Sequence, residues 1–262
     1  MQLFDTGDVR LHYRVDGPDD GAPVVFANSL GTDMRLWDPI LPMLPDGLRI
    51  IRFDKRGHGL STCPTGPYSM GSLITDTEKL LDFLGVQGCV FVGLSIGGMI
   101  AQGLAVKRLD LIRAVVLSNT AAKIGNPDLW AERIADVEKG GIEFIADAVM
   151  ERWFSPQFRK SPELELWRNM LVRQPDDGYA GCSAAISGTD FLTTTSSLRL
   201  PCLGIAGSDD GSTPPDLVRE TTDLIPGSRF HLIRKAGHLP CVEQPQEFAR
   251  VLSEFLKGVG HV

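Results

Sequence analysis

The sequence lacks the features that mark several common classes of protein. It has no C-x-x-C pair and an odd number of cysteines, five, so we expect free thiols in a reducing cytoplasm. Its histidines and cysteines lack the spacing of metal ligands, and we expect no metal and no cofactor. No apolar run approaches membrane-spanning length, and the N-terminus shows no signal-peptide pattern.

Acidic side chains outnumber basic ones, 33 to 26. The net charge is −7, whereas nucleic acids and anionic membranes select basic surfaces, so we expect neither as a partner. The net charge does not exclude an anionic small molecule as a substrate, because such a molecule needs only one positive side chain at its binding site. The patterns G-x-x-x-x-G-K-[ST] and G-x-G-x-x-G are both absent, which argues against nucleotide sites of those types. The 262 residues, 43% hydrophobic and 23% charged, fit one large α/β domain.

The most informative segment is Gly93-Leu94-Ser95-Ile96-Gly97, which reads G-x-S-x-G. An apolar run, residues 89–92, precedes it and resembles a buried strand, and residues 98–105 after it are typical of a helix. A strand, a sharp turn with serine at its apex and a helix make a nucleophile elbow. The five residues alone could also form an inert turn, but their context favours Ser95 as a nucleophile.

The rest of the chain alternates strand-like and helix-like segments, which predicts an α/β fold with a mostly parallel, eight-stranded sheet covered by helices on both faces. We expect the first two strands to form an antiparallel hairpin. The expected strands are 3–6, 10–15, 24–27, 50–53, 89–92, 114–117, 202–206 and 230–233. The expected helices are 37–44, 69–84, 98–105, 134–149, 163–172, 217–224 and 246–256.

The alternation stops between residues 120 and 198, where no buried-strand run occurs and the segments look helical. We therefore expect a core domain made of residues 1–119 and 199–262, with 120–198 as a helical insertion. Such an insertion can pack on itself, cover an active site as a lid, or do both.

A serine hydroxyl is a poor nucleophile near neutral pH unless a base accepts its proton. His238 follows the last predicted strand, at the carboxyl edge of the sheet where open α/β folds build their sites. We predict it to be the general base. The other histidines fit the role less well: His12 and His231 lie in strand-like segments, His261 in the terminal tail, and His58 in a loop interpreted as a structural turn.

The base needs an orienting acid, and the developing oxyanion needs backbone donors. Asp209 and Asp210 follow the strand at 202–206, and their adjacent side chains should point in different directions. For the oxyanion we predict the N–H groups of Ile96, which follows the nucleophile, and of Leu30, in the loop after the strand at 24–27.

These residues resemble the α/β-hydrolase superfamily over essentially the whole chain, including its serine–aspartate–histidine order. The resemblance favours Asp210 as the acid and leaves Asp209 as a solvated loop carboxylate. The chain departs from many members at Asn28-Ser29, where they carry His-Gly. The sequence therefore leaves open which contacts hold the Leu30 loop in place. The landmarks are Asp54-x-Arg56-Gly57-His58-Gly59-x-Ser61, Gly93-x-Ser95-x-Gly97-Gly98, Gly207-x-x-Asp210 and Gly237-His238.

Further segments, two of them inside the insertion, are similar to the 3-oxoadipate enol-lactonases. That resemblance implies hydrolysis of the enol-lactone of the β-ketoadipate pathway to 3-oxoadipate. Because this substrate carries a carboxylate, we predict Arg133, with Trp153 nearby, as its binding residues; a surface-exposed Arg133 is the alternative. The similar segments are 28–33, 118–125, 151–154, 178–182 and 237–241.

Other functions share this fold. A broad carboxylesterase or a cofactor-free haloperoxidase-like enzyme has the same triad, and a ligand-binding protein can use the fold without turnover. Serine at position 95 argues against dehalogenases and epoxide hydrolases, which place aspartate there, and against dienelactone hydrolases, which place cysteine.

Overall fold

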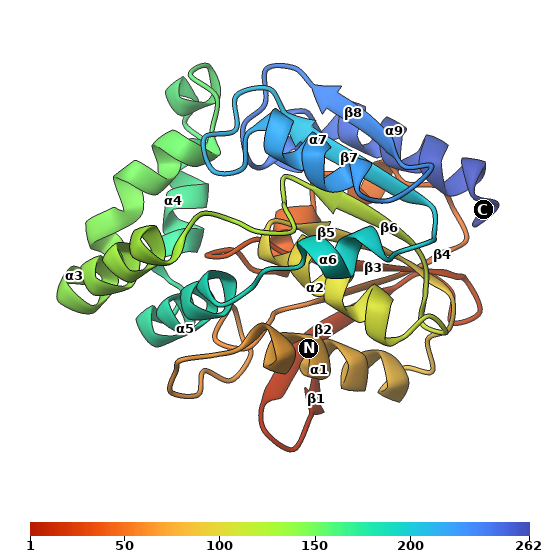
Figure 1. The fold of residues 1–262 in the computed structure, drawn as a ribbon, viewed down its shortest axis with the longest axis horizontal. Coiled ribbons are helices and arrows are strands. Elements are labelled where there is room, and N and C mark those ends of the chain that lie inside the picture. The colour runs from red at the N-terminus through yellow and green to blue at the C-terminus, as the bar shows by residue number, and fades with distance from the viewer.

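The computed structural model describes residues 1–262 and contains one eight-stranded sheet in the order β1-β2-β4-β3-β5-β6-β7-β8 (Figure 1). β1 and β2 run antiparallel to their neighbours, and the remaining strands are parallel, as predicted. The strands are β1 (Gln2–Asp5), β2 (Arg10–Asp16), β3 (Ala22–Ala27), β4 (Leu48–Phe53), β5 (Cys89–Leu94), β6 (Ile112–Ser118), β7 (Cys202–Gly207) and β8 (Arg229–Ile233).

Helices cover both faces of the sheet. In Figure 1, α1, α2, α6 and α7 lie in front of the strands and α9 lies behind them. None of the helices combines the length and the apolar composition that crossing a bilayer requires. The α-helices are α1 (Met70–Phe83), α2 (Ile96–Lys107), α3 (Pro127–Trp153), α4 (Leu164–Val172), α5 (Asp176–Ser187), α6 (Leu192–Ser196), α7 (Pro215–Asp223), α8 (Pro240–Glu243) and α9 (Pro245–Gly258).

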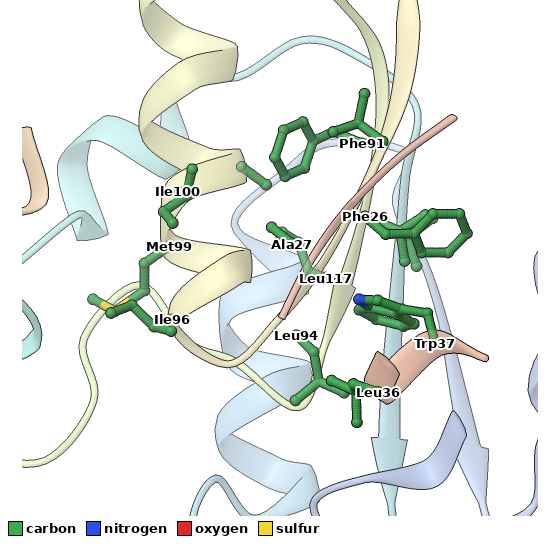
Figure 2. Packing of buried hydrophobic residues seen from close by; sticks show 14 of the residues in the cluster. Phe26, Ala27, Leu36, Trp37, Phe91, Leu94, Ile96, Met99, Ile100 and Leu117 are labelled. Carbon is green, nitrogen blue, oxygen red and sulfur yellow. The ribbon is translucent and has the colours of Figure 1, made fainter. Parts of the chain in front are cut away.

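The centre of the core lies where α2 packs on β3 and β5. All six residues of β5 are buried, because its two neighbours are strands and helices cover both of its faces. On the opposite face from α2, the rings of Phe26 and Trp37 pack at a centroid distance of 4.9 Å, with their planes tilted by 50° (Figure 2). Ile96 and Met99 fill the α2 side in the same view. Ser95, the residue that follows β5, is therefore anchored in this buried core.

The segment between β6 and β7 holds α3 to α6. Helices α4 and α5 each pack on α3, and the three form the green and blue-green group at the left of Figure 1. α3 is broken at Gly141, whose φ of 70° and ψ of 178° no helix interior tolerates. The predicted limits of the insertion, 120 and 198, enclose these four helices, and its role as a lid stays a prediction.

Two expectations about helices differ from the structure. The predicted helix at 37–44 is wrong: the chain makes two short 3₁₀ turns instead, η1 (Met34–Trp37) and η2 (Leu41–Met43). Pro39 and Pro42 explain this, because proline lacks an N–H and its ring clashes with the preceding turn of an α-helix. The sequence also did not indicate α5, α6 or α8, which are short or, in α5, diluted by glycines at 178 and 181.

The close contact of α2 with β3 gives a test of the fold. A Cβ at Gly97 would overlap the carbonyl oxygen of Ala27. We expect Gly97→Ala to lower the free energy of unfolding in urea by about 1–3 kcal/mol. Gly71→Ala in α1, where only Ser69 Oγ lies near, at 3.6 Å, should instead gain about 0.5–1 kcal/mol from helix propensity. Equal effects of the two substitutions would contradict the packing described here.

Candidate active site

Ser95 occupies the sharp turn between β5 and α2. Its φ of 58° and ψ of −120° lie outside the regions that residues with a side chain favour. The turn is held from both sides, because Ser95 N donates to Ser118 O at 3.0 Å and Thr120 Oγ1 donates to Ser95 O at 2.6 Å. A Cβ at Gly93 would overlap the carbonyl of Gly97. Ser95 lines a cavity, and its hydroxyl makes no hydrogen bond to another group of the protein.

His238 and Asp210 form a buried pair beside this turn. Nδ1 of His238 donates to Oδ2 of Asp210 at 2.9 Å, and both side chains are almost completely buried. We assign the proton to Nδ1 because a carboxylate can only accept, which leaves the Nε2 lone pair free to accept. Asp209, the alternative acid, is exposed.

Neutral donors surround the Asp210 carboxylate. Asn119 Nδ2 and Thr213 Oγ1 each donate to Oδ2 at 2.8 Å, and Ser212 N donates to Oδ1 at 2.7 Å. Burial raises the pKa of Asp210, but the His238 charge and these hydrogen bonds outweigh it, so the net pKa lies below the ordinary value. Asp210 therefore stays ionised. Asn119, which has a positive φ of 46°, carries no local sequence signal for this contact.

Ser29 is the hydrogen-bond partner of Nε2 of His238 in this structure. Its hydroxyl lies 3.3 Å from Nε2 of His238, whereas the structure contains no hydrogen bond between Ser95 Oγ and that nitrogen. Ser29, Ser95 and His238 nevertheless line the same cavity, of about 140 Å³. Hydrogen bonds of catalytic groups are often made only when substrate binds.

Two backbone N–H groups are available next to Ser95. Ile96 is the first residue of α2, where an N–H has no partner inside the helix and the positive end of the helix dipole lies. Leu30 N–H has no hydrogen-bond partner within the protein, and Leu30 lines the cavity. Neither of the two N–H groups predicted from the sequence therefore donates a hydrogen bond within the protein.

Two arginines line the cavity, and no carboxylate does. Arg133 lies over the ring of Trp130, at 5.2 Å from the ring centroid, and forms no ion pair. Arg152, which the sequence analysis had not singled out, has no ion pair either; burial and the charge of Arg133 lower its pKa. Trp153 is buried and lines the same cavity. Arg133 is half-buried, so the alternative of a fully exposed side chain does not hold.

Comparisons with known proteins identify the family of the chain. Residues 24–251 match the description "Alpha/beta hydrolase family". The chain belongs to the alpha/beta hydrolase family. It is 35% identical to 3-oxoadipate enol-lactonase 2 of Acinetobacter baylyi, over 95% of this chain and 94% of that protein.

Solved structures place this alpha/beta hydrolase near enzymes of two kinds. It is similar to the enol-lactonase from Burkholderia xenovorans, with a TM-score of 0.94 and 34% identity over 98% of this chain and 100% of that one. It is also similar to a thermophilic esterase from Thermogutta terrifontis, with a TM-score of 0.90 and 30% identity over 97% and 95% of the chains.

The end of α3 is bonded to both loops that carry the acid–base pair. His238 N donates to Trp153 O at 2.7 Å, and Gly211 N donates to Arg152 O at 3.1 Å. Glu243 joins the same elements, because it accepts from Gly237 N at 2.6 Å and from the Ser155 hydroxyl at 2.5 Å. In this hydrolase the insertion and the histidine loop are therefore one connected unit.

His58 has a role that its sequence context did not reveal. Its Nε2 accepts from Gly31 N at 2.9 Å, and Nδ1 lies 3.4 Å from Arg56 O, so the ring braces the loop of Leu30. His58 thus has the structural role predicted for it. The loop that it supports is the one that carries Leu30, a candidate oxyanion donor. Burial and the charge of Lys55 lower the pKa of His58 well below its usual value.

This neutral His58 predicts a pH dependence of stability. Below pH 6.5 the unfolded chain takes up a proton at His58 while the folded protein does not. The stabilisation is therefore present above that pH and lost as pH falls, by up to about 1.4 kcal/mol per unit. Urea unfolding between pH 7.5 and 5.0 should show the free-energy difference between wild type and His58→Gln shrinking as the pH falls. A difference that is constant with pH would contradict a neutral His58.

Proposed function

We propose that this hydrolase opens the ring of 3-oxoadipate enol-lactone to give 3-oxoadipate, with Ser95, His238 and Asp210 as its catalytic triad. The observation that carries the proposal is the cavity itself. It combines a free serine hydroxyl, an accepting imidazole nitrogen and two unpaired arginines, with no carboxylate in its lining. Similarity to proteins named enol-lactonases supports the same substrate.

The first step is attack of Ser95 Oγ on the lactone carbonyl. The hydroxyl proton passes to Nε2 of His238, which requires Ser95 to replace Ser29 as the partner of that nitrogen. Asp210 holds the resulting imidazolium through Nδ1, a pairing that favours the charged ring. General base catalysis of this kind contributes on the order of 10²–10⁴-fold.

The negative charge on the former carbonyl oxygen is stabilised by Leu30 N–H and Ile96 N–H. One such donor lowers the barrier by about 2.7–4 kcal/mol in a measured enzyme. Collapse of the tetrahedral intermediate breaks the ring C–O bond and expels the enolate oxygen, which takes the proton from His238 and ketonises. Water, deprotonated by His238, then hydrolyses the Ser95 ester, and the proton returns to the serine oxygen.

The two arginines give the site its preference for an anion. Arg133 and Arg152 repel each other, and partial burial weakens the screening of that repulsion by water. A bound carboxylate relieves it and forms charge-assisted hydrogen bonds. We assign the free carboxylate of the lactone to this pair, with Trp153 closing the cavity beside it.

We also propose that residues 120–198 act as the lid of the active site. Arg133, Arg152 and Trp153 all come from α3, so the insertion supplies the groups that hold the substrate. Its end is tied to the loops of His238 and Gly211. Binding of the carboxylate at α3 can in this way adjust the position of the base.

Hydrolysis of simple carboxylic esters is the second candidate. It is favoured by the similarity to a Thermogutta terrifontis esterase and by the apolar side chains of Ile124, Leu129 and Ile186 in the cavity. Both activities use the same triad, and they differ in whether the arginines contribute.

Replacing the nucleophile tests the proposed reaction. The purified protein should remove the ultraviolet absorbance of the enol-lactone, and Ser95→Ala should be slower by about 10⁴-fold or more. Ser212→Ala, which changes another serine lining the cavity, is a matched control and should keep most of the activity. Retention of wild-type activity by Ser95→Ala would contradict the assignment.

Removing either arginine tests the assignment of the carboxylate. Arg133→Ala and Arg152→Ala should each raise KM for the enol-lactone by about 10–100-fold, since each removes a hydrogen bond between charged groups. KM for a neutral aryl ester should change far less. Arg219→Ala, which removes an exposed arginine stacked on Phe230, should change neither constant. Equal changes for both substrates would remove this role and favour the esterase.

A further inference from the structure

Lys55 is a buried charge that the proposed mechanism does not use. It follows β4, its residue is 4% exposed, and its ammonium forms no ion pair. Its hydrogen bonds go instead to two backbone carbonyl oxygens, Ser29 O at 2.6 Å and Thr32 O at 3.2 Å. Burying an ammonium without a carboxylate partner is unfavourable, so a charge kept in this place points to a function.

The carbonyl that Lys55 binds belongs to the peptide unit of a candidate oxyanion donor. Ser29 C=O and Leu30 N–H are parts of one planar trans peptide, in which the two groups point in opposite directions. Ser29 O faces the interior at Lys55, so Leu30 N–H faces the cavity that Ser29 and Leu30 line. The next N–H, that of Gly31, turns inward to His58.

We propose that Lys55 is a positioning residue of the oxyanion hole, whose ammonium polarises the Ser29–Leu30 peptide and makes Leu30 N–H a stronger donor to the oxyanion. This inference rests on the proposed function, which makes Leu30 an oxyanion donor. The positive charge acts through the peptide and does not touch the substrate.

The surroundings of Lys55 keep it charged at neutral pH. Burial lowers the pKa of Lys55 to about 8, and Cys182, Asp54 and Asp33 oppose this shift only in part. His58, the other titratable group facing it, stays neutral. The ammonium thus lies about 8 Å from the oxyanion by peptide and hydrogen-bond geometry, a distance at which a buried charge still acts.

Ser29 O also accepts from neutral donors. The effect of the Lys55 charge can therefore be tested separately from the orientation of the Ser29–Leu30 peptide. Thr32 Oγ1 and Thr32 N also donate to Ser29 O, at 2.9 and 3.3 Å. Loss of Lys55 therefore leaves the peptide held and removes its polarising charge, whereas Thr32→Val removes a neutral donor and keeps the charge.

The experiment measures how fast a small alkyl fluorophosphonate modifies Ser95, followed by the mass of the intact protein. Ser95 Oγ bonds to phosphorus, fluoride leaves, His238 takes the proton, and charge develops on the phosphoryl oxygen in the oxyanion hole. We expect the second-order rate constant to fall by roughly 10–50-fold in Lys55→Met and Lys55→Gln, and several-fold less in Thr32→Val. On the enol-lactone, kcat should fall by the same factor with KM unchanged. Lys55→Gln keeps a donor to Ser29 O and serves if the methionine variant does not fold.

The outcomes separate this inference from the function on which it rests. Wild-type rates in the Lys55 variants, or equal losses in Lys55→Gln and Thr32→Val, would overturn the role of the charge. A protein that reacts with the fluorophosphonate but not with the enol-lactone would overturn the proposed substrate and leave the role of Lys55 standing. A wild type whose Ser95 does not react at all would overturn both.

Discussion

In the mechanism we propose, the chemistry of this site depends on the hydrogen bond between His238 and Asp210. It is buried, and it fixes the proton on Nδ1, so Nε2 can accept. The carboxylate can remain ionised there because the charge of His238 and the hydrogen bonds of neutral donors outweigh burial and lower its pKa. Without this pair the strained turn at Ser95 would present only an ordinary hydroxyl.

The positive charges around the cavity have different proposed roles, which depend on where each charge lies. Two arginines on α3 line the cavity, where we propose that they bind an anionic ligand. One lysine lies behind the peptide of Leu30, where we propose that it stabilises the developing oxyanion. The backbone N–H groups of His238 and Gly211 donate to Trp153 O and Arg152 O, and these bonds tie the end of α3 to the loops that carry His238 and Asp210. In this account, substrate recognition and catalysis are mechanically linked through the end of α3.

Much of this arrangement could be predicted from the sequence, because the decisive signals are local. Buried-strand runs, the glycines around Ser95 and the loops after β7 and β8 each carry their meaning in a few residues. What could not be predicted depends on contacts between distant segments. Nothing near Lys55 or His58 in the chain indicates that both hold the loop of Leu30. Trp153 was predicted beside Arg133, but no local pattern shows that its neighbour Arg152 also lines that cavity. The helix predicted at 37–44 failed for a local reason, its two prolines.

A rapid-quench experiment with the enol-lactone tests the central claim most directly. Opening a lactone at a serine expels no separate fragment, so the trapped intermediate should carry the mass of one whole substrate molecule. Peptide mapping should find that mass on Ser95 alone, appearing before free product. An adduct on a different residue, or turnover under single-turnover conditions without any adduct at Ser95, would contradict the account.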